Sequence, residues 1–206
     1  MVGKDIWFLS DHHFFHKNII KFTGADGKLI RPGFSCIEEM NELIVQNHNN
    51  VVKPGSKVYF GGDVGRNFGP LLKRMNGRKR LILGNHDCCD FATHREELAS
   101  FDKILSWRYF GNFSKRFVVS HYPLHPMSFI YRGSQRDEAI QQYKEGREPN
   151  CYNVHGHLHS NLVELDNGHI DTRYYSICCE YQNYTPIHVE DLIKKLGKPQ
   201  AMRNRP

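Results

Sequence analysis

Short apolar runs alternate along the chain with polar or glycine-containing segments, a pattern typical of strands that end in loops. The runs lie at 5–9, 57–60, 80–83, 104–109, 115–119 and 151–154. Because they are short and bounded by polar or glycine-containing segments, they predict strands rather than helices. Longer segments with helical spacing separate the first three runs, so we expect strands and helices to alternate in the first half.

The helix after the first strand has the clearest sequence signals. Apolar residues recur at helical spacing over about 36–49, and Ser35-x-x-Glu38 before them has the capping-box pattern. The segment 162–187 is rich in strand formers and contains a hairpin turn signal at 166–168. Further helices are expected near 68–75, 91–100, 136–144 and 190–196.

Strand–helix alternation in the first half and strands in the second half predict two sheets with helices outside. The 206 residues suit one domain, and the sequence contains no internal repeat, low-complexity tract or linker. We therefore expect a single domain over 1–206, with about 197–206 forming a flexible tail.

Composition is that of an ordinary globular protein, with 39% hydrophobic and 24% charged residues. No apolar run is long enough to span a membrane, and a charged residue and a strand follow the N-terminus too closely for a signal peptide. These features predict a cytoplasmic protein that does not bind membranes. The six cysteines form no Cys-x-x-Cys pair, so we expect reduced, buried thiols.

The net charge of +6 favours an anionic substrate, such as a small phosphorylated or nucleotide-like molecule. Basic residues cluster at 73–74, 78–80 and 194–205, which is compatible with nucleic-acid binding, although no nucleic-acid-binding motif is present. A solvated surface with a frayed C-terminus is the alternative explanation of these clusters.

Metal-binding side chains gather in short motifs at the ends of the predicted strands. The motifs are Asp11-His12-His13, Gly62-Asp63, Gly84-Asn85-His86-Asp87, Ser120-His121 and Gly156-His157-Leu158-His159. Aspartate, asparagine and histidine supply oxygen and nitrogen ligands to divalent metals. Parallel strands place their chemistry at their carboxyl ends, so we expect the motifs to converge there. Each motif alone is weak, but their joint order predicts a dinuclear metal hydrolase.

Two metal ions held close together need a bridging anion, and Asp63 is the natural bridge. Asp11 and His13, two residues apart, can point at one metal. His157 and His159 have the same spacing and could either share a metal or divide between two. A pair of ions would lower the pKa of a shared water, generate hydroxide near neutral pH and neutralise phosphate oxygens.

The remaining polar residues of the motifs, and His155 beside them, have different expected roles. Asn85 offers a neutral amide oxygen as a ligand, and His86 would protonate or stabilise the departing alkoxide. His12 should point away from the metals, Asp87 should fix the turn of its own motif, and His155 should pack internally.

The motif series resembles the calcineurin-like metallophosphoesterase superfamily over about residues 5–185. The opening segment from Ser10 to Ile20 is particularly similar to small single-domain members found in bacteria and phages. This resemblance implies an α/β fold, a four-layer αββα sandwich of two mixed β-sheets flanked by helices.

The resemblance also implies which residue binds which ion. One ion would be bound by Asp11, His13 and His159, and the other by Asn85, His121 and His157. Asp63 would bind both ions. His86 would be the catalytic acid or the hydrogen-bond donor to the transition state. Members of the superfamily use manganese, iron, zinc or nickel, so ligand type alone does not fix the metal.

One position departs from the pattern of the protein serine/threonine phosphatases in this superfamily. Those enzymes have a second aspartate three residues after the bridging one, and it orients the catalytic histidine. Here Arg66 occupies that position, which argues against a protein phosphatase. Either another group orients His86 or it works without one. Arg66 and Arg31 are candidate phosphate contacts, and a surface ion pair is the alternative for Arg66.

Together these features predict a metal-dependent phosphoric ester hydrolase acting on a phosphodiester or phosphomonoester, nucleotide-derived substrates included. The alternative is a nucleic-acid-binding protein or nuclease that uses its basic surface. A catalytically silent scaffold is a third alternative, and the complete set of ligands argues against it.

Overall fold

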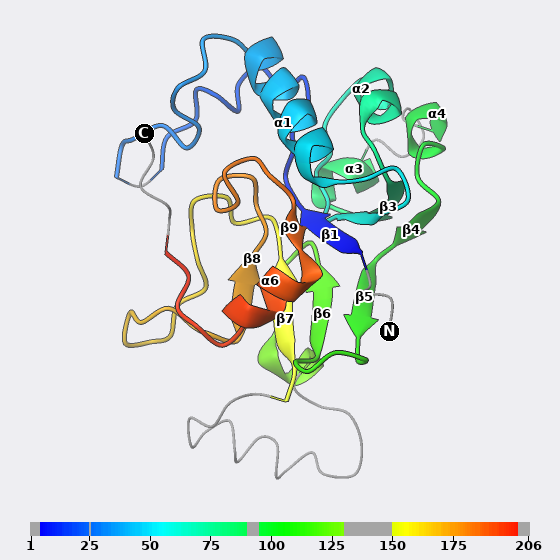
Figure 1. Cartoon of the computed structure of the whole chain (residues 1–206). Helices are drawn as coiled ribbons and strands as arrows, with labels where there is room; N and C mark the ends of the chain where they lie inside the picture. Colours follow the sequence, from blue (N-terminus) through cyan, green and yellow to red (C-terminus); the bar gives the residue numbers. More distant parts are fainter. Residues whose placement is uncertain (1–4, 25, 90–94, 130–149, 202–206) are drawn as a thin grey trace.

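The strands form two mixed sheets, as predicted (Figure 1). The structure, a computed structural model, describes residues 5–24, 26–89, 95–129 and 150–201. The first sheet has the order β4-β3-β2-β1-β9 and the second β5-β6-β7-β8. The strands are β1 Ile6–Leu9, β2 Lys57–Phe60, β3 Arg78–Ile82, β4 Lys103–Leu105, β5 Trp107–Phe110, β6 Phe117–Ser120, β7 Tyr152–His155, β8 Tyr174–Ser176 and β9 Ile187–His188. In each sheet one edge strand, β9 or β5, is antiparallel to its neighbour and the other pairings are parallel.

Most of the predicted helices are present. They are α1 Ile37–Val51, α2 Gly69–Arg74, α3 Asn85–Cys89, α4 Arg95–Leu98, the short 3-10 helix η1 Pro126–Ser128, and α6 Val189–Lys195. The sequence did not predict α3, which begins inside a candidate metal motif. The helix expected around 136–144 lies outside the described residues. Among the residues described, no helix combines the length and apolar character needed to cross a membrane.

The start of α1 differs from the capping-box prediction. Its N-cap is Cys36, which makes no capping hydrogen bond through its side chain. Because the helix begins one residue later than the motif implied, Glu39 rather than Glu38 occupies the third helical position. The Glu39 carboxylate accepts the backbone N–H of Ser35 at 2.8 Å, so a carboxylate still reaches back over the helix start.

Alternate residues of the central strands face two different apolar layers. One face of the first sheet packs against the second sheet through a core that includes Phe8, Tyr59, Ile82, Phe117, Val154 and Tyr175. The opposite face packs against α1 and α2 through a core that includes Leu9, Phe60, Leu81, Met40, Ile44 and Leu72. Both faces of β1 and β2 are therefore buried, which explains their continuous apolar runs.

The outer face of the second sheet has its own, smaller apolar layer. Val118 and Tyr174 from the sheet pack there with Phe129 and Cys151. Among the described residues, η1 and the adjoining loops cover this face. The two packed sheets, the helical layer over the first and this covering over the second agree with the predicted sandwich.

Candidate dinuclear metal centre

Seven residues predicted as ligands come together where β1, β2, β6 and β7 end and α3 begins. Six of them form two groups whose ligand atoms lie within 4.8 Å of one another: Asp11, His13 and His159, and Asp63, His121 and His157. The seventh, Asn85, places its Oδ1 2.9 Å from His121 Nε2. The two sheets therefore contribute jointly to one cluster.

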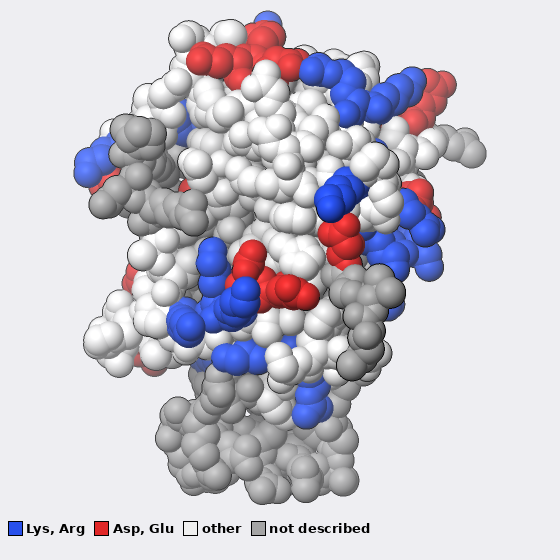
Figure 2. Space-filling model, in the orientation of Figure 1, with Lys and Arg blue, Asp and Glu red and all other residues white. Residues whose placement is uncertain are grey.

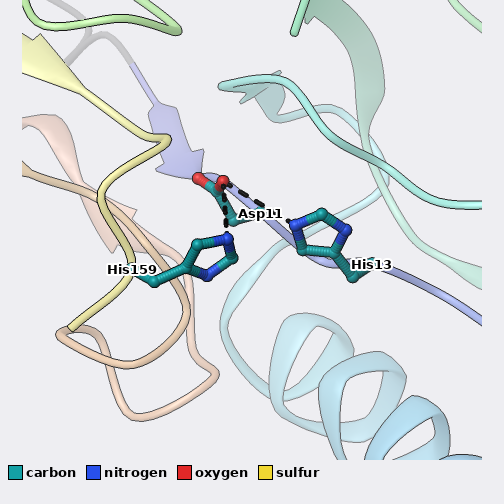
Figure 3. A group of neighbouring side chains, drawn as sticks. All are labelled: Asp11, His13 and His159. Carbon is teal, nitrogen blue, oxygen red and sulfur yellow. Dashed lines mark ion pairs between the residues drawn. The ribbon is translucent and has the colours of Figure 1, made fainter. Parts of the chain in front are cut away.

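The first group joins the loop after β1 to the loop after β7. Both imidazoles point toward the carboxylate of Asp11 in Figure 3. The Nε2 atom of His13 lies 4.0 Å from Asp11 Oδ1, and Nε2 of His159 lies 3.8 Å from the same oxygen. Such spacing leaves room for an ion between the side chains.

The second group centres on Asp63, which follows β2. Its Oδ2 lies 3.5 Å from Nε2 of His121 and 3.8 Å from Nε2 of His13, a member of the first group. Asp63 thus lies between the two groups, as a bridging ligand would. His157 and His159 divide between the groups rather than sharing one.

Five of the seven candidate ligands have left-handed backbone conformations. The φ angles are 57° for Asp11, 50° for His13, 52° for Asp63, 70° for His157 and 49° for His159. These conformations are uncommon for residues other than glycine, cost about 1–3 kcal/mol each and concentrate at functional sites. The backbone of these motifs therefore curls, and alternate side chains face the cluster.

Backbone hydrogen bonds hold the two curled motifs of the first sheet together. Beyond the end of β1, the N–H of Asp11 donates to the carbonyl of Gly62 at 3.0 Å, and the N–H of His13 donates to that of Asp63 at 3.1 Å. The parallel pairing of β1 and β2 thus continues into the loops, which fixes the two carboxylates relative to each other.

The carboxylate of Asp11 is closely surrounded by protein groups. It accepts hydrogen bonds from Ser10 Oγ at 2.5 Å and from the N–H of His157 at 3.0 Å. A Cβ atom at Gly156 would overlap both Ser10 Oγ and this carboxylate. The glycine before His157 is therefore required for the close approach of the His-x-His loop to Asp11.

Asp87 fixes the turn of its motif, as predicted. Its carboxylate accepts the backbone N–H groups of Asp63 at 2.8 Å, Val64 at 3.0 Å and Gly84 at 2.9 Å. The side chain is buried, so these three donors have been removed from water. Asp87 thereby ties the loop after β2 to the loop after β3.

Replacing Asp87 by alanine should lower the free energy of unfolding by about 3 kcal/mol or more. Three buried N–H groups would lose their acceptor, and each such group costs about 1–3 kcal/mol. Urea denaturation would measure the change, and Asp102→Ala, at an exposed carboxylate paired with Arg78, provides the control. Equal stabilities of the two variants would contradict this role.

The electrostatics of the cluster favour a cation. Burial alone would raise the pKa of Asp63, but interactions with His121 and His86 together outweigh burial and lower it. Burial also opposes charge on His121, yet Asp63 and Asp11 raise the pKa of that ring to about 9. Burial lowers the pKa of His13 well below its ordinary value, which leaves this ring neutral and able to donate a lone pair.

One orphaned atom tests whether the cluster fits a metal ion. His13 Nε2 is buried and has no hydrogen-bond partner, although it faces the carboxylates of both Asp11 and Asp63. Buried polar atoms are rarely left unpaired, and a divalent ion would supply the missing partner. The two groups, with their nitrogen and oxygen donors, are compatible with two divalent ions.

His86 lies at the edge of the cluster, and its side chain is exposed to solvent. The side chain is 61% exposed, and its Nε2 lies 3.9 Å from Asp63 Oδ2. Its backbone N–H donates to Asp63 Oδ1 at 2.9 Å. Within the described part of the chain, no carboxylate or carbonyl accepts a hydrogen bond from this ring. Arg66, in the position of the missing aspartate, is exposed.

Arg31 does not occupy the position expected of a phosphate contact. It is fully buried, and its Nε donates to Glu180 Oε1 at 2.8 Å. Its other nitrogens donate to the carbonyls of His12 at 3.0 Å and Asp11 at 2.5 Å. Because the guanidinium is enclosed and bonded within the protein, it supports the first group from behind and does not reach a substrate.

The sequence did not predict a role for Glu180, the partner of Arg31. Glu180 Oε1 lies 2.9 Å from Nδ1 of His159, and this bond outweighs burial to raise the pKa of His159. Glu180 belongs to no motif, and no local signal in the sequence distinguishes it. His12, predicted to point away from the metals, is buried and stacks on Phe60 at 4.6 Å, and His155 is buried inside the protein, as predicted.

No protein-family model matches the chain. An uncharacterized protein of Methanocaldococcus jannaschii is 28% identical over 210 residues, covering 98% of this chain and 97% of that protein. A protein of unknown function from Aquifex aeolicus has a similar structure, with a TM-score of 0.58, 26% identity and coverage of 92% and 97%. An archaeal phosphodiesterase aligns with a TM-score of 0.39 and 15% identity over 89% and 98% of the two chains. The Aquifex likeness shows that the fold recurs over nearly the whole length.

Proposed function

We propose that this protein is a metal-dependent phosphoesterase that hydrolyses a small phosphodiester or phosphomonoester. The observation that carries the proposal is the convergence of Asp11, His13, Asp63, Asn85, His121, His157 and His159 in two adjacent groups. Such a pair of sites is typical of phosphatases and nucleases that use two metals. Manganese, iron, zinc and nickel all accept this mixture of nitrogen and oxygen ligands.

Different residues would bind the metal ions, donate a proton and contact the substrate phosphate. The two groups would hold divalent ions, which would supply an activated water and neutralise phosphate oxygens. His86, exposed beside Asp63, is placed to donate a proton to the leaving oxygen. Arg66, exposed at the position of the missing aspartate, could form a charge-assisted hydrogen bond with the substrate phosphate.

Two exposed aromatic rings beside the cluster support a substrate with a planar group. Tyr122 is 47% exposed, and its ring lies 4.6 Å from that of His157. Phe22 is 45% exposed, and its ring lies 5.7 Å from that of His16, which itself lies beside His13. Exposed aromatic rings are suited to stacking on nucleobases. We therefore include nucleotide-derived esters among the proposed substrates.

Removal of metal should abolish activity. Protein treated with chelator and then dialysed should hydrolyse neither bis-p-nitrophenyl phosphate nor p-nitrophenyl phosphate, and added Mn²⁺ should restore turnover. Metal analysis of the same samples would relate turnover to ions bound per chain, and a panel of mono-, di- and cyclic phosphates would define the ester class. Full turnover by the metal-free protein would reject the proposal.

A nucleic-acid-binding protein or nuclease is the alternative. On the face seen in Figure 2, Lys and Arg form separate groups, several of them beside Asp and Glu, rather than a continuous basic stripe. The charges on this face therefore give the alternative no specific support. Tight DNA or RNA binding that persists without metal and weakens steeply with salt would favour it.

A further inference from the structure

A buried ion pair lies directly behind the first group of candidate ligands. Arg31 and Glu180 are 149 positions apart in the sequence, and their side chains are fully buried with Nε and Oε1 2.8 Å apart. A buried pair of this kind contributes little net stability by itself, because both charges have lost their hydration. Its contacts suggest a more specific role.

Each member of the pair holds a different part of the first group. Arg31 donates hydrogen bonds to the carbonyl oxygens of Asp11 and His12, in the loop after β1. Glu180 lies 2.9 Å from Nδ1 of His159, in the loop after β7. Through four hydrogen bonds, the pair therefore connects the two loops that provide all three candidate ligands of that group.

The geometry also distinguishes the two nitrogens of His159. Nδ1 faces Glu180, whereas Nε2 faces Asp11 Oδ1 at 3.8 Å. A histidine that binds metal through one nitrogen commonly donates its other N–H to a carboxylate, which fixes the tautomer and the ring plane. Here the carboxylate lies on the Nδ1 side, and the lone pair of Nε2 is directed into the group.

The second group has no equivalent support in the described residues. Nδ1 of His121 lies 2.9 Å from the carbonyl oxygen of Gly61, which is a neutral acceptor. His159 and His121 are thus oriented by chemically different partners, an anion for His159 and a peptide carbonyl for His121. A change that neutralises Glu180 should affect the two groups unequally.

We propose that Glu180 is a positioning residue: held by Arg31, it fixes the ring and tautomer of His159 and so sets the metal affinity of the first group alone. This inference rests on the proposed two-metal site. It adds an asymmetry, because one ion depends on a buried ion pair and the other does not.

Metal titration of Glu180→Gln tests this role. The apparent affinity for one of two ions should fall by about 10–100-fold, the usual effect of losing such a partner, while the other affinity stays at the wild-type value. Calorimetry or metal analysis at graded Mn²⁺ concentrations would show this. Asp171→Asn is the matched control, because Asp171 forms a second buried ion pair, with Arg173, and should leave both affinities unchanged.

A measurement on the wild-type protein covers the case in which Glu180→Gln does not fold. Nitrogen-15 NMR of the histidine rings in zinc-loaded protein should show His159 protonated at Nδ1 and coordinated through Nε2. Coordination through Nδ1 would overturn the proposal, as would a folded Glu180→Gln protein that binds both ions with wild-type affinity.

These outcomes separate this inference from the proposed function. A wild-type protein that binds two ions and hydrolyses phosphoesters, with a Glu180→Gln variant that binds ions equally well, would overturn only the role of Glu180. A wild-type protein that binds no ion would overturn both proposals. If Glu180→Gln and Asp171→Asn both lowered the affinity for both ions, the effect would be general destabilisation. That result would also reject selective positioning.

Discussion

Replacing Asp63 by asparagine should reduce turnover by more than about 100-fold. Its Oδ2 lies 3.5 Å from Nε2 of His121 and 3.8 Å from Nε2 of His13, so this carboxylate lies close to candidate ligands of both groups. An amide keeps the shape and can still accept the His86 N–H, but its nitrogen cannot bind a second cation. Loss of outer partners alone costs about 10–100-fold, and loss of a shared ligand should cost more.

Turnover of bis-p-nitrophenyl phosphate and metal content per chain would be measured together for Asp63→Asn. The variant should bind fewer ions than the wild type at equal Mn²⁺, whereas Asp102→Asn, at an exposed carboxylate paired with Arg78, should match the wild type in both measurements. Full activity in chelator-treated Asp63→Asn protein would reject the two-metal mechanism.

The sequence predicted the position of the candidate site because its residues lie next to predictable strands. Runs such as 57–60 are buried on both faces and carry a continuous apolar signal, and parallel pairing of β1 with β2 brings Asp11 beside Asp63. Local chemistry also predicted that Asp87 would fix its turn. In each case the deciding information lies within a few residues of the motif.

The parts that the sequence did not predict depend on distant contacts. Nothing near Arg31 indicates that Glu180, 149 positions away, would enclose its guanidinium, so an arginine in a polar loop suggested a phosphate contact. The left-handed conformation at His157 and His159 is stabilised by surrounding structure against local preference. The division of these histidines between two groups follows from that curl, and spacing alone left it open.

Replacing His86 by alanine should distinguish a general acid from a binding residue. A positioned acid contributes about 10²–10⁴-fold when the leaving group needs a proton. We therefore expect a fall of that size for esters with alkyl leaving groups, and a much smaller one for p-nitrophenyl esters, whose phenolate departs without protonation. Steady-state kinetics across a series of leaving groups would give the dependence.

Because the ring of His86 is exposed, a change in rate should not result from loss of the fold. Its side chain is 61% exposed, and its ring accepts or donates no hydrogen bond among the described residues, so truncation should leave the fold intact. His169→Ala, at an exposed histidine outside the cluster motifs, is the matched control and should behave as wild type with every ester. An equal loss for alkyl and p-nitrophenyl leaving groups would show that His86 acts through binding or positioning and not by proton donation. Wild-type rates with every ester would exclude it from the reaction.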